Sequence, residues 1–313
     1  MKTKHANRAI PQRPDATSRR PRRRAALPVA FSLALTAAGC AVLGEPAGTP
    51  RKETVYAVTD ANRLVRFNAG QPRQLDLDLP LQGLQPGETL VGIDFRVARG
   101  MLYGLGTSGR LYVIDTTNAS VRTIGNAPLA PALVESDAGF DFNPTVDRIR
   151  VVGAAGRNLR LHPDTGAVID GDPALPGVQL DGALVYANSD ANAGKPASIQ
   201  AAAYTYNKVD EKVTTNFAID TRQGLLVTQG SRETARVPVS PNSGRLFTVG
   251  PLKVGPIGRV SFDIADVDNT ALIAVTAPGA GSAVLHLVNL DNASTTRLGT
   301  IGGGGIRGIA IEP

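Results

Sequence analysis

Hydrophobic and polar residues alternate with period two along most of the chain after residue 53, and turn residues interrupt the alternation at short intervals. The stretch 139–162 is the clearest example. Residues 139–143, 148–153 and 158–162 each alternate, and Asn-Pro and Gly-Ala-Ala-Gly separate them. Short alternating segments bounded by turn residues are typical of β-strands. No window shows a convincing amphipathic helical period, so the pattern predicts an all-β chain.

The strand that opens this stretch recurs along the sequence. Its copies begin about 47, 64, 58 and 47 residues apart, a spacing that suits four-stranded propeller blades with loop insertions. The copies are Ile93-Asp94-Phe95, Phe140-Asp141-Phe142, Tyr204-Thr205-Tyr206, Phe262-Asp263-Ile264 and Ile309-Ala310-Ile311. Five copies predict a five-bladed β-propeller, with six or seven blades if residues 170–196 and 231–258 contain further strands.

The two ends of the repeat array indicate how the ring closes. The first unit starts at its second strand, near Thr54, while the chain ends just after the fifth opening strand, at residues 308–312. Pairing of the N- and C-terminal strands in one blade removes an exposed sheet edge. We therefore expect the propeller domain to span residues 54–313.

The N-terminal segment differs from the rest in charge. The formal net charge is +6, but nine of the 33 basic residues and one of the 27 acidic residues precede residue 25, so the remainder carries about −2. A basic start, an apolar run at 25–38 and a small-residue exit predict a signal peptide over residues 1–39. The apolar run is short for a membrane span, and the near-neutral remainder argues against nucleic acid as a partner.

Cys40 is the single cysteine of the chain and directly follows Ala37-Ala38-Gly39. This arrangement resembles the lipobox of bacterial lipoproteins, which implies a lipid on Cys40 and attachment to a membrane. The lipobox prefers Leu where this chain has Ala37, which leaves ordinary cleavage nearby open. Residues 40–53 read as a flexible tether. We expect an anchored envelope lipoprotein of the outer membrane or the periplasm, or alternatively a periplasmic or secreted protein, exported by the general secretory or twin-arginine route.

Three aspartates occupy equivalent positions on the opening strands, namely Asp94, Asp141 and Asp263, where two other repeats carry Thr205 and Ala310. Opening strands of propeller blades lie nearest the axis. The aspartates are therefore candidates for a partial carboxylate ring in the central channel, with oxygen ligands suited to Ca²⁺ or Mg²⁺. The alternative, which we favour, is that each carboxylate accepts backbone hydrogen bonds and orders its blade. The acidic stretch 266–269 lacks calcium-loop spacing and is interpreted as a solvated turn.

Arg148 and Arg150 belong to the densest basic group after the leader, and strand alternation places them on one strand face. They are candidate anion-binding residues. The alternative is an exposed strand face paired with acids of the next blade. His162 and His286 neighbour no Ser or Cys motif and form no zinc-type cluster. The absence of Trp and the 4% aromatic content count against a lectin-type sugar site.

Several longer phrases resemble a bacterial family known as domain of unknown function 4394. They include residues 55–64, 87–96, 139–152, 158–161, 190–194 and 202–205, and the resemblance extends from Thr54 to Pro313. It implies an exported, propeller-like domain without an established activity. The family's Asn-Pro-Pro-Asn-Asp-Gly-like turn is altered here to Ser240-Pro241-Asn242-Ser243-Gly244.

Together these features predict an exported, lipid-anchored propeller that acts as a binding or interaction module of the cell envelope, with an envelope protein as a candidate partner. The alternative function is a hydrolase or lyase that uses Asp94, Asp141 and Asp263, with or without a metal. A third alternative is a purely structural envelope protein. No catalytic residue or organic cofactor is predicted.

Overall fold

A computed structural model describes residues 45–130 and 137–313 of the chain. Within these residues it contains twenty β-strands and two 3₁₀ turns, η1 (Val97–Arg99) and η2 (Pro241–Ser243). The described residues belong to one compact unit. In the described part of the chain, no helix has the length and apolar character needed to cross a membrane.

The strands form five sheets, which we call blades 1 to 5. Blade 1 consists of β20 (Ile306–Ile311), β1 (Thr54–Thr59), β2 (Arg63–Asn68) and β3 (Leu75–Pro80). Blade 2 consists of β4 (Leu90–Arg96), β5 (Met101–Gly106), β6 (Leu111–Ile114) and β7 (Val121–Ile124). Blade 3 consists of β8 (Ala138–Asn143), β9 (Arg148–Gly153) and β10 (Asn158–Leu161).

Blade 4 consists of β12 (Ile199–Tyr204), β13 (Asn216–Asp220), β14 (Leu225–Gln229), β15 (Arg245–Pro251) and β11 (Val185–Tyr186). Blade 5 consists of β16 (Arg259–Ile264), β17 (Ala271–Thr276), β18 (Val284–Val288) and β19 (Thr295–Thr300). Apart from the short β11, which runs parallel to β15, the strands within each blade pair antiparallel. Hairpin turns between alternating segments account for this arrangement.

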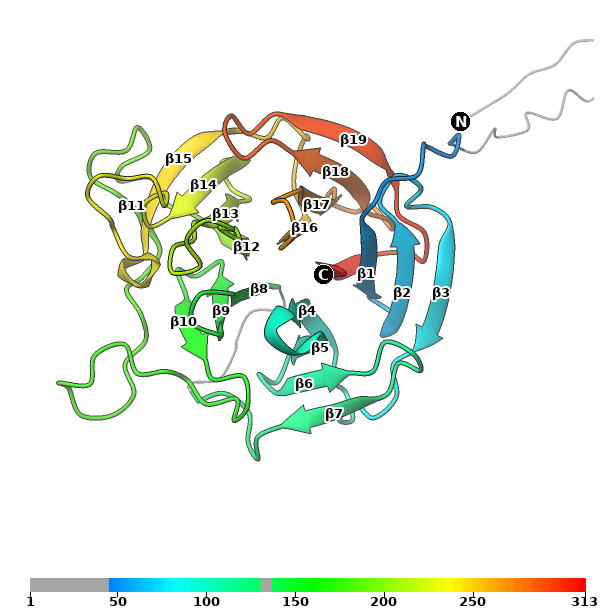
Figure 1. Cartoon of the computed structure of the whole chain (residues 1–313), viewed down its shortest axis with the longest axis horizontal. Helices are drawn as coiled ribbons and strands as arrows, with labels where there is room; N and C mark the ends of the chain where they lie inside the picture. Colours follow the sequence, from blue (N-terminus) through cyan, green and yellow to red (C-terminus); the bar gives the residue numbers. More distant parts are fainter. Residues whose placement is uncertain (1–44, 131–136) are drawn as a thin grey trace, which may run out of the picture. The chain divides into compact units, whose positions relative to one another are not determined.

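The five blades surround a central axis, as Figure 1 shows, and the predicted five-bladed propeller is confirmed. Strands β20, β4, β8, β12 and β16 are innermost, and each contacts the innermost strands of both neighbouring blades. Strand β20 pairs with β1, with Ala310 opposite Tyr56, so the two ends of the array close blade 1 as expected.

Two blades depart from the regular four-strand pattern. In blade 3, an isolated bridge between Leu161 and Val168 stands where a fourth strand would pair with β10. In blade 4, residues 185–186 cross over and add β11 to the outer edge of β15. The insertions at 170–196 and 231–258 therefore extend blade 4, through β11 and β15, and do not form a sixth blade among the described residues.

The core lies between the blades, where aliphatic and aromatic side chains of neighbouring sheets interlock. Between blades 2 and 3, for example, the rings of Tyr103 and Phe142 pack edge to face, with their centroids 5.1 Å apart. The interface of blades 3 and 4 is different, because its apolar cluster around Val152 and Leu246 is accompanied by buried Arg150 and Asn158. This polar interface leads directly to the candidate sites.

Close approach of the inner strands requires glycine at one position in this interface. A Cβ atom on Gly139 would lie 2.5 Å from Val152 Cγ2 and 2.7 Å from the backbone nitrogen of Ala202. Those distances are shorter than van der Waals contact, so a larger residue would force blades 3 and 4 apart.

Candidate functional site

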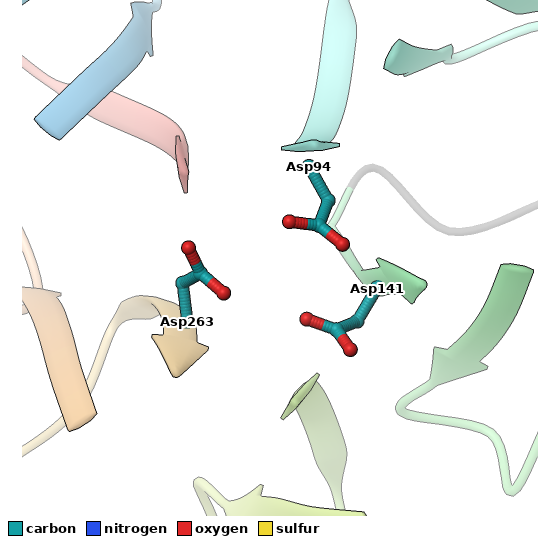
Figure 2. A group of neighbouring side chains, drawn as sticks. All are labelled: Asp94, Asp141 and Asp263. Carbon is teal, nitrogen blue, oxygen red and sulfur yellow. The ribbon is translucent and has the colours of Figure 1, made fainter. Parts of the chain in front are cut away.

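Asp94, Asp141 and Asp263 lie together at the centre of the ring. They project from the inner strands β4, β8 and β16, and one carboxylate oxygen of each lies within 4.8 Å of the others. Figure 2 shows the three carboxylates gathered around a common space. All three residues are buried. Strand alternation explains this placement, because the flanking apolar residues face the neighbouring blades and leave the aspartate to face the axis.

Each of these aspartates also links its blade to the next. Asp94 Oδ2 accepts a hydrogen bond from Phe142 N–H at 2.6 Å, and Asp141 Oδ1 accepts one from Tyr204 N–H at 2.9 Å. Asp263 Oδ2 accepts one from Ile311 N–H at 2.5 Å. The structural role expected from the sequence is therefore present in the geometry, alongside the convergence of the carboxylates.

In blade 4, the residue that corresponds to Asp141 differs from the one expected from the sequence. Phe142 and Ile311 each follow the axial residue of their strand, and Tyr204 is the matching donor on β12. The residue equivalent to Asp141 is therefore Ala203, and the proposed equivalence of Thr205 was wrong. The Thr205 hydroxyl instead accepts a hydrogen bond from Thr215 N–H at 2.9 Å, beyond the end of β12.

The three aspartates lie in a cavity of about 330 Å³, which we call the axial pocket. Its acidic lining residues are Asp94, Asp141, Asp147, Glu211, Asp263 and Asp266, and no Lys, Arg or His is among the described residues that line it. Of these six, Asp147 alone forms an ion pair within the described residues, with Arg96 at 2.5 Å. The axial pocket is thus lined by a concentration of acidic residues and by no basic residue among those described.

Burial makes these carboxyl groups reluctant to ionise. It raises the pKa of Asp263 from its ordinary value of 3.8 to about 7, and that of Asp266 to about 6. Burial, together with repulsion from neighbouring carboxylates, raises the pKa of Asp94 and of Asp141 well above the ordinary value. Converging carboxylate oxygens are also the donors that Ca²⁺ and Mg²⁺ prefer.

Arg148 and Arg150 both line a second cavity, of about 710 Å³, between blades 3 and 4; we call it the inter-blade pocket. The expectation of an exposed strand face is wrong for Arg150, whose side chain is 2% exposed. Its guanidinium donates to Tyr204 Oη at 3.1 Å, Asn158 Oδ1 at 2.7 Å, Asp181 Oδ2 at 2.6 Å and Asn242 Oδ1 at 2.6 Å. Arg148 is half-buried and donates to the backbone carbonyl of Asp147 at 2.8 Å.

Three features of these sites were not anticipated from the sequence. Asp266 lines the axial pocket although its acidic stretch was interpreted as a solvated turn. Asp181 pairs with both Arg150 and Arg160. Arg96 is buried and binds Asp147 and Asp164 from blade 3. For Arg96 and Arg150 the sequence signal was a basic residue inside an alternating strand. The acidic residues that they bind lie in loops without a recognisable pattern.

The remaining candidates lie away from these pockets. His162 accepts a hydrogen bond on Nδ1 from Asp164 N–H at 3.2 Å, and His286 lies on β18, where burial lowers its pKa. Neither histidine lines the axial or the inter-blade pocket. Cys40 lies outside the described residues.

Comparisons with known proteins find one matching family model and several solved structures of low sequence identity. The model of a family described as "Domain of unknown function (DUF4394)" matches residues 63–310. A crystal structure of a nidogen/laminin complex shares 11% identity over 83% of this chain and 98% of that chain, with a TM-score of 0.46. No curated protein matches the chain.

Two other solved structures have lower TM-scores. A structural genomics protein of unknown function from Bacteroides thetaiotaomicron shares 13% identity over 81% of this chain and 59% of its own, with a TM-score of 0.41. Hsv2 from Kluyvelomyces marxianus shares 9% identity over 80% of this chain and 69% of its own, with a TM-score of 0.31.

Proposed function

This chain belongs to the DUF4394 family, and on that premise we propose that it is an exported, lipid-anchored binding module of the cell envelope whose axial pocket holds a divalent cation. One observation carries the proposal. Asp94, Asp141 and Asp263, from three different blades, direct carboxylate oxygens to within 4.8 Å of one another in a pocket lined by further acids.

Hydrogen bonding between blades does not by itself account for these carboxylates. A neutral side chain performs the same task nearby, where Ser261 Oγ on β16 accepts the N–H of Ile309 on β20 at 2.8 Å. Bringing several buried carboxylates together costs free energy through desolvation and repulsion. A Ca²⁺ or Mg²⁺ ion among them offsets that cost, and the bonds to the backbone hold the oxygens in place as ligands.

The leader supplies the cellular context of the proposal. A basic start, a short apolar run and Cys40 after small residues suit export and lipid attachment, which makes the membrane one partner of the protein. Residues 45–53 lie against the domain, because Glu45 accepts from Thr300 N–H at 3.0 Å and Arg51 N–H donates to Asn68 Oδ1 at 2.8 Å. In this arrangement a propeller attached through its N-terminal segment presents its loops to an envelope protein or to a small ligand.

A binding role fits the axial pocket better than hydrolase or lyase chemistry. The described residues that line it include no Ser, Cys, His or Lys, so a Ser–His or Cys–His pair and a Schiff-base lysine are not among them. A metal-assisted enzyme that uses Asp94, Asp141 and Asp263 remains the alternative function, and it requires the same cation.

Thermal melting of the purified protein tests the cation proposal. Tm is measured first with a chelator and then with Ca²⁺ or Mg²⁺ in excess of the chelator. A free metal concentration of about a hundred times the dissociation constant is expected to raise Tm by about 5 °C. Asp141→Asn is expected to lose most of this response while remaining folded. Asp76→Asn, which changes an exposed carboxylate on β3, is the matched control and keeps the response. Equal melting with and without both metals would rule out the cation site.

A further inference from the structure

The inter-blade pocket is lined mainly by basic residues, whereas the axial pocket is lined by acidic ones. Five basic side chains line it, namely Arg148, Arg150, Arg160, Lys212 and Arg232, and Glu233 is the single acidic residue among the described lining residues. Its walls come from the β8–β9 turn, from β9 and β10, and from the loops 212–214 and 231–242 of blade 4. The pocket therefore lies between the two blades whose interface is polar.

The floor of this pocket carries an uncompensated positive charge. Arg150 and Arg160 share one carboxylate, because Asp181 accepts from Arg150 at 2.6 Å and from both ends of the Arg160 fork at 2.8 Å. The side chains of Arg150 and Asp181 are 2% and 1% exposed. Two guanidinium groups on one buried carboxylate leave a net positive charge, and the side chain of Arg160, which is 21% exposed, presents that charge to the pocket.

The rim adds two more cations. Within the described residues Arg148 and Lys212 form no ion pair, although both line the pocket. Arg148 is held by the carbonyl of Asp147 at 2.8 Å and is half-buried, so its guanidinium is partly ordered before any ligand arrives. Arg232 is engaged elsewhere, with Asp291 at 3.2 Å and the carbonyl of Leu290 at 2.7 Å.

The pocket also has an apolar side. Ile169, Val213 and Val239 contribute to its wall, and its volume of about 710 Å³ is ample for an organic molecule. A bare inorganic anion would leave this surface uncovered. The combination of a cationic floor, two unpaired cations at the rim and an apolar wall suits an anion that carries an organic body.

We propose that the inter-blade pocket binds a small organic dianion, such as a phosphate monoester or a dicarboxylate, with its charged group on Arg148 and Lys212 and in the field of the Arg150 and Arg160 guanidinium groups. Guanidinium forks bind such oxyanions through paired, charge-assisted hydrogen bonds. The organic body of the ligand packs against Val213 and Val239. This site is separate from the proposed cation site, although Tyr204 touches both: its N–H donates to Asp141 and its hydroxyl accepts from Arg150.

Isothermal titration calorimetry of the purified protein tests the proposal at constant ionic strength. Glucose 6-phosphate and succinate serve as the two probes, and glucose serves as the neutral control. At least one of the dianions is expected to bind with a saturable isotherm, and glucose is expected to give none. Arg148→Gln is expected to weaken that binding by about tenfold or more, because it removes one charge-assisted contact.

Two variants separate the possible explanations. Arg122→Gln removes an exposed arginine of β7 in blade 2 and is expected to bind as the wild type does. Asp141→Asn is expected to keep dianion binding even where it loses the response to metal, so the two proposals fail independently. Circular dichroism and Tm verify that each variant is folded.

Other outcomes would overturn the proposal. Binding of neither dianion, unchanged binding by Arg148→Gln, or an equal loss in Arg122→Gln would each do so. Vesicles that contain an anionic phospholipid form a further arm of the experiment, because a lipid headgroup carries the same phosphate chemistry. Binding to vesicles alone, without binding of either soluble dianion, would also overturn the proposal of a small-molecule site.

Discussion

Asp94 on β4 accepts a hydrogen bond from the backbone N–H of Phe142 on β8, at 2.6 Å, across the boundary between blades 2 and 3. The residue that precedes Phe142 is Asp141, which makes the same kind of contact with blade 4. One side chain therefore both joins adjacent blades and presents charge to the axis. The hydrogen bonds between blades and the acidity of the axial pocket therefore depend on the same three residues, Asp94, Asp141 and Asp263.

The hydrogen-bonding role of Asp141 can be separated from its charge. Asp141→Ala is expected to lower the free energy of unfolding by about 1–3 kcal/mol, because it leaves the buried N–H of Tyr204 without an acceptor. Asp141→Asn keeps an acceptor oxygen and is expected to lose far less. Urea unfolding in chelator measures both variants. An equal loss in the two would mean that the negative charge, rather than the acceptor, stabilises the fold.

The raised carboxyl pKa values predict an inverted pH dependence of stability. Burial raises the pKa of Asp263 from 3.8 to about 7, so between these values the folded protein binds more protons than the unfolded chain. The contribution of this group to the free energy of unfolding is therefore largest below pH 4. It falls as pH rises toward 7 and levels off above that pH.

Urea unfolding in chelator from pH 4 to pH 8 measures this slope. Asp263→Asn is expected to make the decline with rising pH shallower than in the wild type, since the amide does not titrate. Because a metal competes with these protons, Ca²⁺ is expected to stabilise the wild type more at pH 8 than at pH 5. Identical slopes in the two proteins would contradict the assignment of the effect to Asp263.

The Arg150, Asp181 and Arg160 cluster predicts unequal effects of its members. Asp181→Asn leaves the buried guanidinium of Arg150 without its counter-charge and is expected to cost about 3–5 kcal/mol of stability. Arg160→Gln removes a side chain that is 21% exposed and leaves the Arg150–Asp181 pair intact, so we expect a cost of about 1 kcal/mol or less. Guanidinium chloride unfolding compares them, and a larger loss for Arg160→Gln would contradict this account.

Closure of the ring by β20 predicts that the last strand is indispensable. Removal of residues 306–313 deletes the buried Ile306, Ile309 and Ile311 and exposes the inner edge of β1. Each isoleucine contributes about 1.5–3 kcal/mol on burial, which together approaches the total stability of a typical domain. Circular dichroism is expected to show an unfolded or aggregated chain. Removal of Pro313 alone is the control and is expected to leave a cooperative melt.

The sequence by itself determined the architecture of this protein. Five blades were predicted from the period-two alternation and from the recurrent opening strand. Their closure by β1 and β20 was predicted because the first unit starts at its second strand and the chain ends after a fifth opening strand. These features follow from local geometry, because alternate residues of a strand face opposite ways and a ring of strands must pair its ends. The same alternation selected Asp94, Asp141 and Asp263, which the structure gathers at the axis.

Only the tertiary structure decided which side chains meet between blades. The register of β12 places Ala203, and not Thr205, at the axis, because inter-blade hydrogen bonds set that register across 63 residues of sequence. Arg150 is buried because Asp181 and Asn242, 31 and 92 residues away, complete its hydrogen bonds. Such partners lie in loops without periodicity, where the sequence carries no pattern and packing between blades alone brings opposite charges together.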